Sequence, residues 1–162
     1  SDVETGALAV ELFTAGGIAG MVGGQWLDLE AEGRALELEE LRAVHRGKTG
    51  ALIEASCVLG ALAARAPAPQ RDAMRDFGRE VGLAFQVADD VLDATGTSEE
   101  LGKTAGKDAA VAKSTYVQLL GVEGARAAAV RHADAAVNSL ERSGVSSGTL
   151  AALARYIVTR RH

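Results

Sequence analysis

Three carboxylates stand inside an apolar stretch of this chain, and no other feature constrains the fold and the chemistry as much. Asp89, Asp90 and Asp93 follow the apolar run 82–88. At about 100° per residue, a helix places Gln86, Asp89 and Asp93 within an arc of roughly 60°. Like charges on one helix face repel, so the cluster requires a compensating cation. Oxygen ligands without His or Cys favour Mg²⁺, which commonly joins carboxylates to phosphates. A solvated acidic face is the alternative, and the apolar flanks argue against it.

The composition favours a helical protein with a single core. The 162 residues are 48% apolar but only 4% aromatic, so Ala, Leu and Val must fill the interior. We expect residues 1–162 to form one domain. The formal charge of -5 argues against a nucleic-acid partner. Cys57, in an apolar run, is expected to be a core residue.

Apolar periodicity and breaker residues predict an all-α, antiparallel helical bundle. No segment alternates as a strand would. A bend is expected around Gly47 and Gly50, and Pro67 and Pro69 should separate two helices. The predicted helices cover residues 3–33, 38–64, 70–95, 115–120, 122–142 and 146–160.

The first predicted helix is unusually rich in small residues. Gly16, Gly20 and Gly24 repeat at the spacing used for close helix packing in membranes, but Glu11 and Asp28 bracket the segment. We therefore expect close packing within a soluble bundle. No apolar run reaches the roughly 18 to 20 residues that a membrane span requires, and the N-terminal residues lack signal-peptide features. The sequence thus predicts a cytoplasmic protein without a membrane span.

Several cations could share a pocket with the acids. Lys48 lies between two glycines and precedes an apolar run, and Lys103, Lys107 and Lys113 follow the aspartates. Lysines and a hydroxyl such as that of Thr49 can satisfy the phosphate oxygens that a metal leaves free. Acids and lysines together therefore predict a site for a metal-bound polyphosphate.

These residues carry a resemblance to a known family. The segments concerned are 82–93 with its Asp-Asp-x-x-Asp, Leu101-Gly102-Lys103, 113–116, 23–29 and 45–53. They resemble the second aspartate-rich region, the glycine-glutamine-aspartate helix and the lysine-threonine segment of trans-isoprenyl diphosphate synthases. The resemblance covers nearly the whole chain and corresponds to the C-terminal half of the family's polyprenyl synthetase domain.

The resemblance implies a fold, a reaction and partners. The fold would be the C-terminal part of an isoprenoid synthase bundle, and the protein would be a homodimer. The reaction would be head-to-tail prenyl transfer, in which an allylic prenyl diphosphate ionises and isopentenyl diphosphate attacks the cation. The product would be an all-trans prenyl diphosphate, and the cofactor would be Mg²⁺.

The resemblance also implies roles for individual residues. Asp89, Asp90 and Asp93 would hold the metal. A second set would bind the diphosphate and stabilise it as a leaving group: Lys48, Thr49, Gln86, Lys103 and, as a further substrate-binding residue, Lys113. Phe85 and the small residues at 16–24 could house a hydrocarbon tail.

The family's first aspartate-rich motif is absent from the 162 residues, which contain a single Asp-Asp-x-x-Asp. We therefore expect the chain to belong to a longer synthase and to be inactive alone. Two alternatives remain. A terpene cyclase would need a second metal motif, for which Asn138-Ser139-Leu140-Glu141 lacks the spacing. A non-catalytic subunit of a synthase would have no need of the intact acids.

Overall fold

The structure is a computed structural model that describes residues 2–96, 114–145 and 147–160. Every regular element within these ranges is helical, as the sequence predicts. The elements are α1 (Asp2–Gly16), α2 (Met21–Glu30), α3 (Leu38–His45), the π-helical turn η1 (Arg46–Gly50), α4 (Ala51–Ala63), α5 (Ala68–Thr95), α8 (Tyr116–Arg142) and α9 (Gly148–Thr159).

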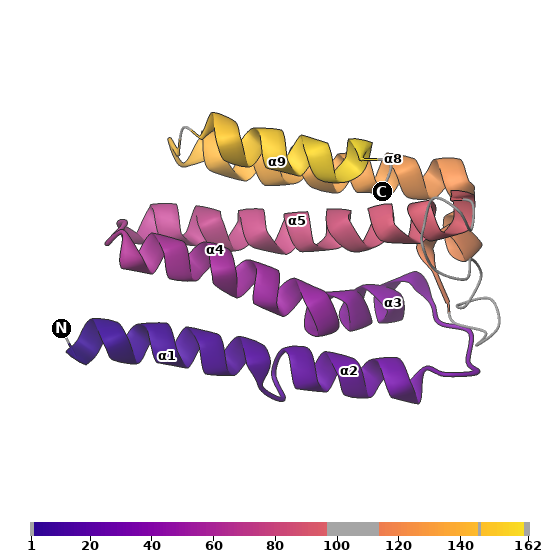
Figure 1. The fold of residues 1–162 in the computed structure, drawn as a ribbon, viewed down its shortest axis with the longest axis horizontal. Coiled ribbons are helices and arrows are strands. Elements are labelled where there is room, and N and C mark those ends of the chain that lie inside the picture. Colours follow the sequence, from indigo (N-terminus) through magenta and orange to yellow (C-terminus); the bar gives the residue numbers. More distant parts are fainter. Residues whose placement is uncertain (1, 97–113, 146, 161–162) are drawn as a thin grey trace.

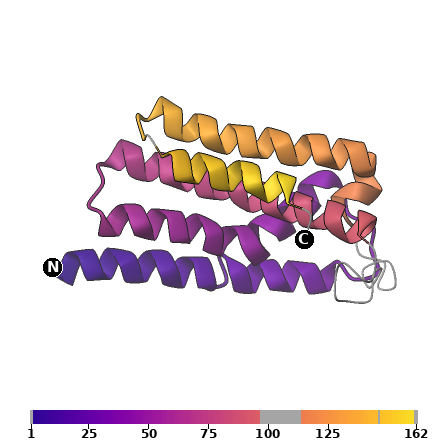
Figure 2. The ribbon, with the colours of Figure 1, turned by 45° about the horizontal axis from the view of Figure 1, so that its top comes forward.

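The helices lie nearly parallel or antiparallel in stacked layers (Figures 1 and 2). α1 and α2 run end to end along one side of the bundle, α3, α4 and α5 form the middle, and α8 and α9 cover the other side (Figure 1). α5 packs on both α4 and α8, and α1 packs on α4. The long helix that bears the aspartates is therefore the central element.

Small side chains allow the central helices to pack closely. α8 presents a buried alanine face to α5, which contributes Phe77, Val81 and Ala84 to the shared core. Tyr116, Phe77, Leu83 and Val87 are the largest fully buried side chains. This core agrees with a composition rich in Ala and poor in aromatics.

Most predicted boundaries are confirmed, and their causes are local. Pro67 and Pro69 separate α4 from α5, with a proline in the first turn of α5. Thr115 caps α8 by accepting a hydrogen bond from the backbone N–H of Gln118 at 3.2 Å. Gly121 interrupts α8 with a φ of 70°, where the sequence predicts a break.

The prediction of one helix over residues 3–33 is wrong. The chain leaves the helix at 17–20 and resumes it in α2. Gly20 is required at this break, because a Cβ there would lie 2.0 Å from the backbone oxygen of Ala15. Glycine in this segment thus serves a chain break as well as helix packing.

The expectation that no stretch is long and apolar enough to cross a membrane is also wrong. Residues Thr5–Glu30 are long and apolar enough by length and composition alone, and 11% of their most apolar window is buried in the structure. The turn at 17–20 interrupts this stretch. The finding is weak evidence for a membrane span, because soluble helices meet the same criteria.

The predicted bend at Gly47 and Gly50 is the π-helical turn η1, which joins α3 to α4 without a loop. η1 is held between two neighbouring helices through glycine contacts. A Cβ on Gly24 of α2 would lie 2.0 Å from the backbone nitrogen of Lys48, and a Cβ on Gly82 of α5 would lie 2.9 Å from the Cα of Gly50. No side chain other than hydrogen fits at either crossing.

We predict that Gly24→Ala destabilises the protein by about 1–3 kcal/mol, because the added methyl group forces α2 away from η1. Gly60→Ala is the matched control, since a Cβ at Gly60 meets nothing within 4 Å. That variant should be neutral or more stable by up to about 1 kcal/mol, through helix propensity. Urea unfolding followed by circular dichroism measures both; equal stability of the two variants would contradict the packing argument.

Candidate active site

A cavity of about 210 Å³ lies where the C-terminal half of α5 meets α2, α3 and η1. Its lining contains most of the polar residues that the sequence singles out and that the structure describes. The polar lining comprises Asp28, His45, Lys48, Gln86, Asp89, Asp90, Asp93, Ser114 and Thr115. Ala31, Leu36, Leu41 and Val44 form its apolar wall.

α5 supplies the acidic wall of this cavity, as the helical spacing predicts. Asp89 and Asp90 are half-buried, whereas Asp93 is exposed. Oδ2 of Asp90 accepts a hydrogen bond of 2.7 Å from the backbone N–H of Tyr116. Asp89 pairs with Arg160, which follows α9. Two of the three acids thus also connect α5 to the C-terminal helices.

Lys48 reaches the same cavity from η1. Its Nζ donates to Oδ2 of Asp28 at 2.6 Å, and the Asp28 side chain is 15% exposed. This pairing holds an ammonium group near the aspartates of α5. Asp28 was not among the predicted site residues, although it lies in the 23–29 segment. The available signal was an acid near the end of an apolar helix, six residues before the nearest basic residue, Arg34.

His45 is a second site residue that sequence reasoning missed. It is 9% exposed and stacks on the ring of Tyr116, with ring centroids 5.7 Å apart. Its Nδ1 is buried without a hydrogen-bond partner in the structure. Burial lowers the pKa of His45 to about 4, and the nearby Lys48 acts in the same direction while Asp28 opposes it.

Tyr116 connects several parts of the site. Its hydroxyl accepts a hydrogen bond of 3.2 Å from Nε of Arg42, and burial raises the pKa of the phenol. The adjacent segment is tied to the N-terminal half of the chain, because the backbone N–H of Leu36 donates to Oγ of Ser114 at 2.9 Å. The start of α8 is therefore anchored beside the acidic wall.

Other predicted site residues are not brought together here. Thr49 is half-buried in η1 and lines neither this cavity nor the larger one. Lys103, Lys107 and Lys113 lie outside the described residues. Phe85 does not line either cavity; Arg160 lies over its ring, at 4.5 Å from the centroid.

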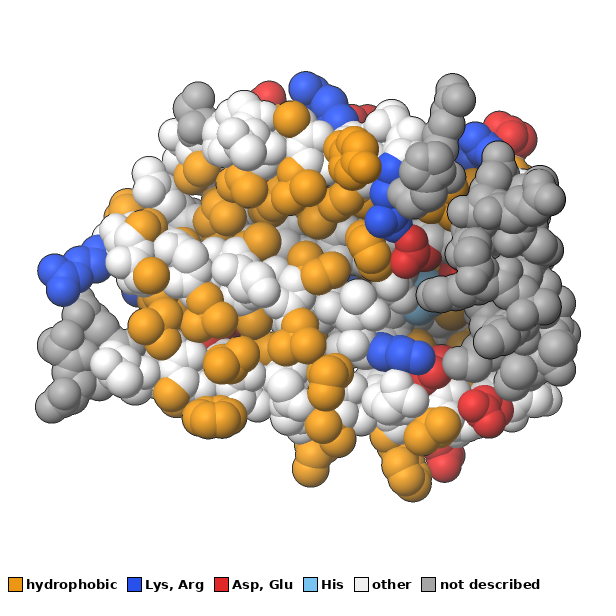
Figure 3. Space-filling view, in the orientation of Figure 1, with side chains coloured by type: hydrophobic (Ala, Val, Ile, Leu, Met, Phe, Trp, Pro, Cys, Tyr) orange, Lys and Arg blue, Asp and Glu red, His pale blue; other side chains and the backbone are white. Residues whose placement is uncertain are grey.

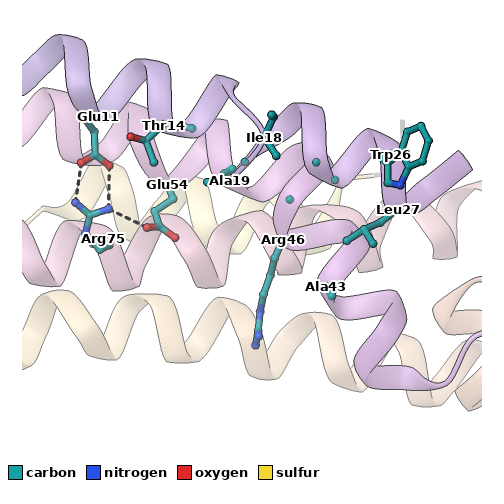
Figure 4. A pocket seen from close by; sticks show the side chains of 16 residues that line it. Glu11, Thr14, Ile18, Ala19, Trp26, Leu27, Ala43, Arg46, Glu54 and Arg75 are labelled. Atoms are coloured by element: carbon teal, nitrogen blue, oxygen red, sulfur yellow. Dashed lines mark hydrogen bonds and ion pairs between the residues drawn. The ribbon is translucent and has the colours of Figure 1, made fainter. Parts of the chain in front are cut away.

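A larger cavity of about 590 Å³ lies between α1, α2 and η1 (Figure 4). Gly20, Gly23 and Gly24 line it, which agrees with the predicted small-residue surface. At one end Arg75 donates to Glu11 at 2.8 Å and to Glu54 at 3.0 Å. These carboxylates raise the pKa of Arg75 and compensate its charge. The larger cavity is thus a weaker candidate for polar chemistry.

None of the residues 138–141 lines either of these two cavities. Ser139 is 4% exposed, and its hydroxyl donates to the backbone oxygen of Ala136 at 2.7 Å. A serine that is buried and bonded in this way serves helix packing.

The oxygen donors on α5 suit Mg²⁺ by their chemistry, because three carboxylates and an amide share one cavity wall. Among the described residues no group of three acids, histidines or cysteines converges on a single point as a metal centre would require. A metal would therefore need further ligands, which a diphosphate can supply.

Comparison with known proteins places this geometry in a family. A family model described as Polyprenyl synthetase matches residues 4–146. Farnesyl diphosphate synthase of Escherichia coli is 46% identical over 99% of this chain and 55% of that protein. Geranylgeranyl pyrophosphate synthase of Capsicum annuum is 45% identical over 96% of this chain and 42% of its own length.

Solved structures agree with the sequence relatives. A geranyltransferase of Helicobacter pylori, solved with magnesium and isoprenyl diphosphate, superposes with a TM-score of 0.80 at 34% identity, over 98% of this chain and 52% of that one. An FPP/GFPP synthase of Zymomonas mobilis gives a TM-score of 0.81 at 34% identity, over 97% and 52%. The chain belongs to the polyprenyl synthetase family and has the isoprenoid synthase fold. It spans about half the length of the relatives that it matches.

We predict that His45 makes the stability of the protein depend on pH. The pKa of His45 is about 6.5 when unfolded and about 4 when folded, so between these values the unfolded state binds more protons. Stability should therefore fall as the pH decreases from about 6.5 to about 4, by about 3 kcal/mol in total from this group.

Urea unfolding at a series of pH values measures this effect. His45→Asn removes the titrating group, and the difference between the two curves separates His45 from the carboxylates. Parallel curves for the two proteins would show that His45 is not buried as a neutral side chain.

Proposed function

We propose that the protein of which this chain is a part is a trans-prenyltransferase of the farnesyl or geranylgeranyl diphosphate synthase type. One observation carries the proposal: the acidic wall of α5 faces Lys48 across a single cavity. Membership of the polyprenyl synthetase family supports it, as do relatives named farnesyl and geranylgeranyl diphosphate synthases. The substrates would be an allylic prenyl diphosphate and isopentenyl diphosphate.

Asp89, Asp90 and Asp93 would hold Mg²⁺ on the allylic diphosphate. When bound, the metal would neutralise charge on the leaving diphosphate. Lys48 and Gln86 line the same cavity and would bind the diphosphate oxygens. Thr49, Lys103 and Lys113 remain in the proposed set of diphosphate ligands by family resemblance.

Asp28 would position Lys48 through their 2.6 Å hydrogen bond. An ammonium group that is already oriented loses less freedom on binding phosphate and stabilises the charge that develops as the carbon–oxygen bond breaks. A neutral His45 would add no further positive charge beside Lys48 and the aspartates. The protein needs no nucleophile, because isopentenyl diphosphate attacks the allylic cation.

We propose that residues 1–162 form the C-terminal half of the polyprenyl synthetase domain. The share of the relatives that the chain covers supports this assignment. One acidic cluster stabilises the leaving group from one side only, so the chain alone should not catalyse condensation. A cytoplasmic location also remains a prediction.

We predict that Asp93→Asn in the full-length protein lowers kcat/KM by about 100-fold or more, because it removes a metal-binding charge. Asp93 is exposed on the cavity wall, so the fold should survive the change. The measurement is product formation from geranyl diphosphate and isopentenyl diphosphate with Mg²⁺.

Asp134→Asn is the matched control, because Asp134 is exposed on α8 and outside the cavity; its activity should stay within about twofold of wild type. The isolated 162-residue chain should give no product. Normal turnover of Asp93→Asn would refute the assignment of the acids.

We also propose that the protein is a homodimer whose interface includes α1 and α2. Apolar side chains gather along the edge of the molecule formed by these helices (Figure 3). Phe13 is 76% exposed, Ile18 85% and Trp26 63%. Several large, exposed apolar side chains on one side of a molecule are typical of protein interfaces.

We predict that Phe13→Asp converts the full-length protein from dimer to monomer, because it places a charge in the apolar interface. Val130→Asp is the control, since Val130 is 46% exposed on α8 and lies on a different helix from the proposed interface. Light scattering at a protein concentration of roughly tens of micromolar measures the molecular mass of each variant in solution. A Phe13→Asp variant that stays dimeric would place the interface elsewhere.

A further inference from the structure

Arg160 connects the C-terminal end of the bundle to the acidic wall. It follows α9, and its backbone N–H donates to the carbonyl oxygen of Tyr156 at 2.9 Å. Its guanidinium group crosses to α5, where Nη2 pairs with Oδ1 of Asp89. The same group lies over the ring of Phe85, at 4.5 Å from the centroid. Phe85 and Asp89 are one helical turn apart, so α5 presents an aromatic face and a carboxylate to one cation.

The arginine end of this contact is more enclosed than in an ordinary surface ion pair, whereas the Asp89 side chain is 40% exposed. The Arg160 side chain is 17% exposed, compared with 58% for Arg34 in another ion pair of this chain. Its Nε is buried without a hydrogen-bond partner in the structure. A guanidinium in this environment is held by Asp89 and Phe85 while one of its donors is left without a partner.

The pair conflicts with the role that we propose for Asp89. A guanidinium and a divalent cation on the same carboxylate would repel each other at short range. The two cations therefore compete for Asp89.

We propose that Arg160 is a positioning residue that acts as a resident counter-ion of the metal site. It neutralises Asp89 while the site holds no substrate, and it leaves Asp89 when a metal-bound diphosphate enters. Because Arg160 directly follows α9, filling of the site loosens the end of that helix. This inference rests on the proposed function and extends it to a coupling between the C-terminal helix and the metal site.

The test is Mn²⁺ binding to the full-length protein in the absence of diphosphate, followed by electron paramagnetic resonance. Arg160→Gln should bind Mn²⁺ about fivefold or more tightly than wild type, because the competing charge is gone. Arg155→Gln is the matched control: Arg155 is exposed on α9 and does not line the cavity, so it should bind Mn²⁺ as wild type does. Circular dichroism verifies that both variants keep their helices.

A second measurement follows the helix end without relying on the variants. Hydrogen exchange at the backbone amides of 157–160 should become faster in wild type when Mn²⁺ and inorganic diphosphate are added together. In Arg160→Gln these amides should already exchange fast, and the ligands should change them little.

Unchanged or weaker Mn²⁺ binding by Arg160→Gln would overturn the inference, as would the absence of binding in that variant. Slower exchange at 157–160 on ligand addition would also overturn it, because Arg160 would then be held more firmly. The proposed function is tested separately by the turnover of Asp93→Asn. That variant could lose activity, in support of the function, while Arg160 proves irrelevant.

Discussion

The close approach of three backbone segments is the constraint on which the site depends. The π-helical turn η1 lies between Gly24 of α2 and Gly82 of α5, where the backbones are too close for any Cβ. This contact puts Lys48 within reach of Asp28 on one side and beside the aspartates of α5 on the other. A larger residue at either glycine would separate the groups that share the cavity. Packing of backbone against backbone, rather than any single ion pair, therefore brings the charges together.

Within the described part of the chain, two of the four acids that line the cavity are paired with a cation. Lys48 is paired with Asp28, Arg160 with Asp89, and His45 is held neutral by burial. Such pairing lowers the cost of placing several ionic groups in a partly desolvated cavity. A metal-bound diphosphate would bring both a cation for the acids and an anion for the lysine. Binding would then exchange the internal partners of Lys48 and Asp89 for ligand partners, and the metal would add positive charge beside Asp90 and Asp93.

The exposed apolar side of the bundle has a different origin. The side chains of Phe13, Ile18 and Trp26 are solvated in this structure, although they belong to the most apolar part of the chain. The chain covers about half of the relatives that it matches. A second subunit, or the rest of the longer protein that we propose, would reduce this exposure, and either would account for helices that are apolar on both faces.

The sequence determined the helical class, most helix boundaries and the acidic face of α5. These features depend on local interactions: helical periodicity, prolines between helices, capping residues such as Thr115, and the fixed angle between Gln86, Asp89 and Asp93. The break at 17–20 was missed, although the Gly16-Gly17 pair is a local turn signal, because the surrounding small apolar residues suit a helix. Tertiary structure alone decided that Asp28 pairs with Lys48 and that Arg160 reaches Asp89. These partners are 20 and 71 residues apart, and such contacts arise from the way helices pack, which residue spacing does not encode.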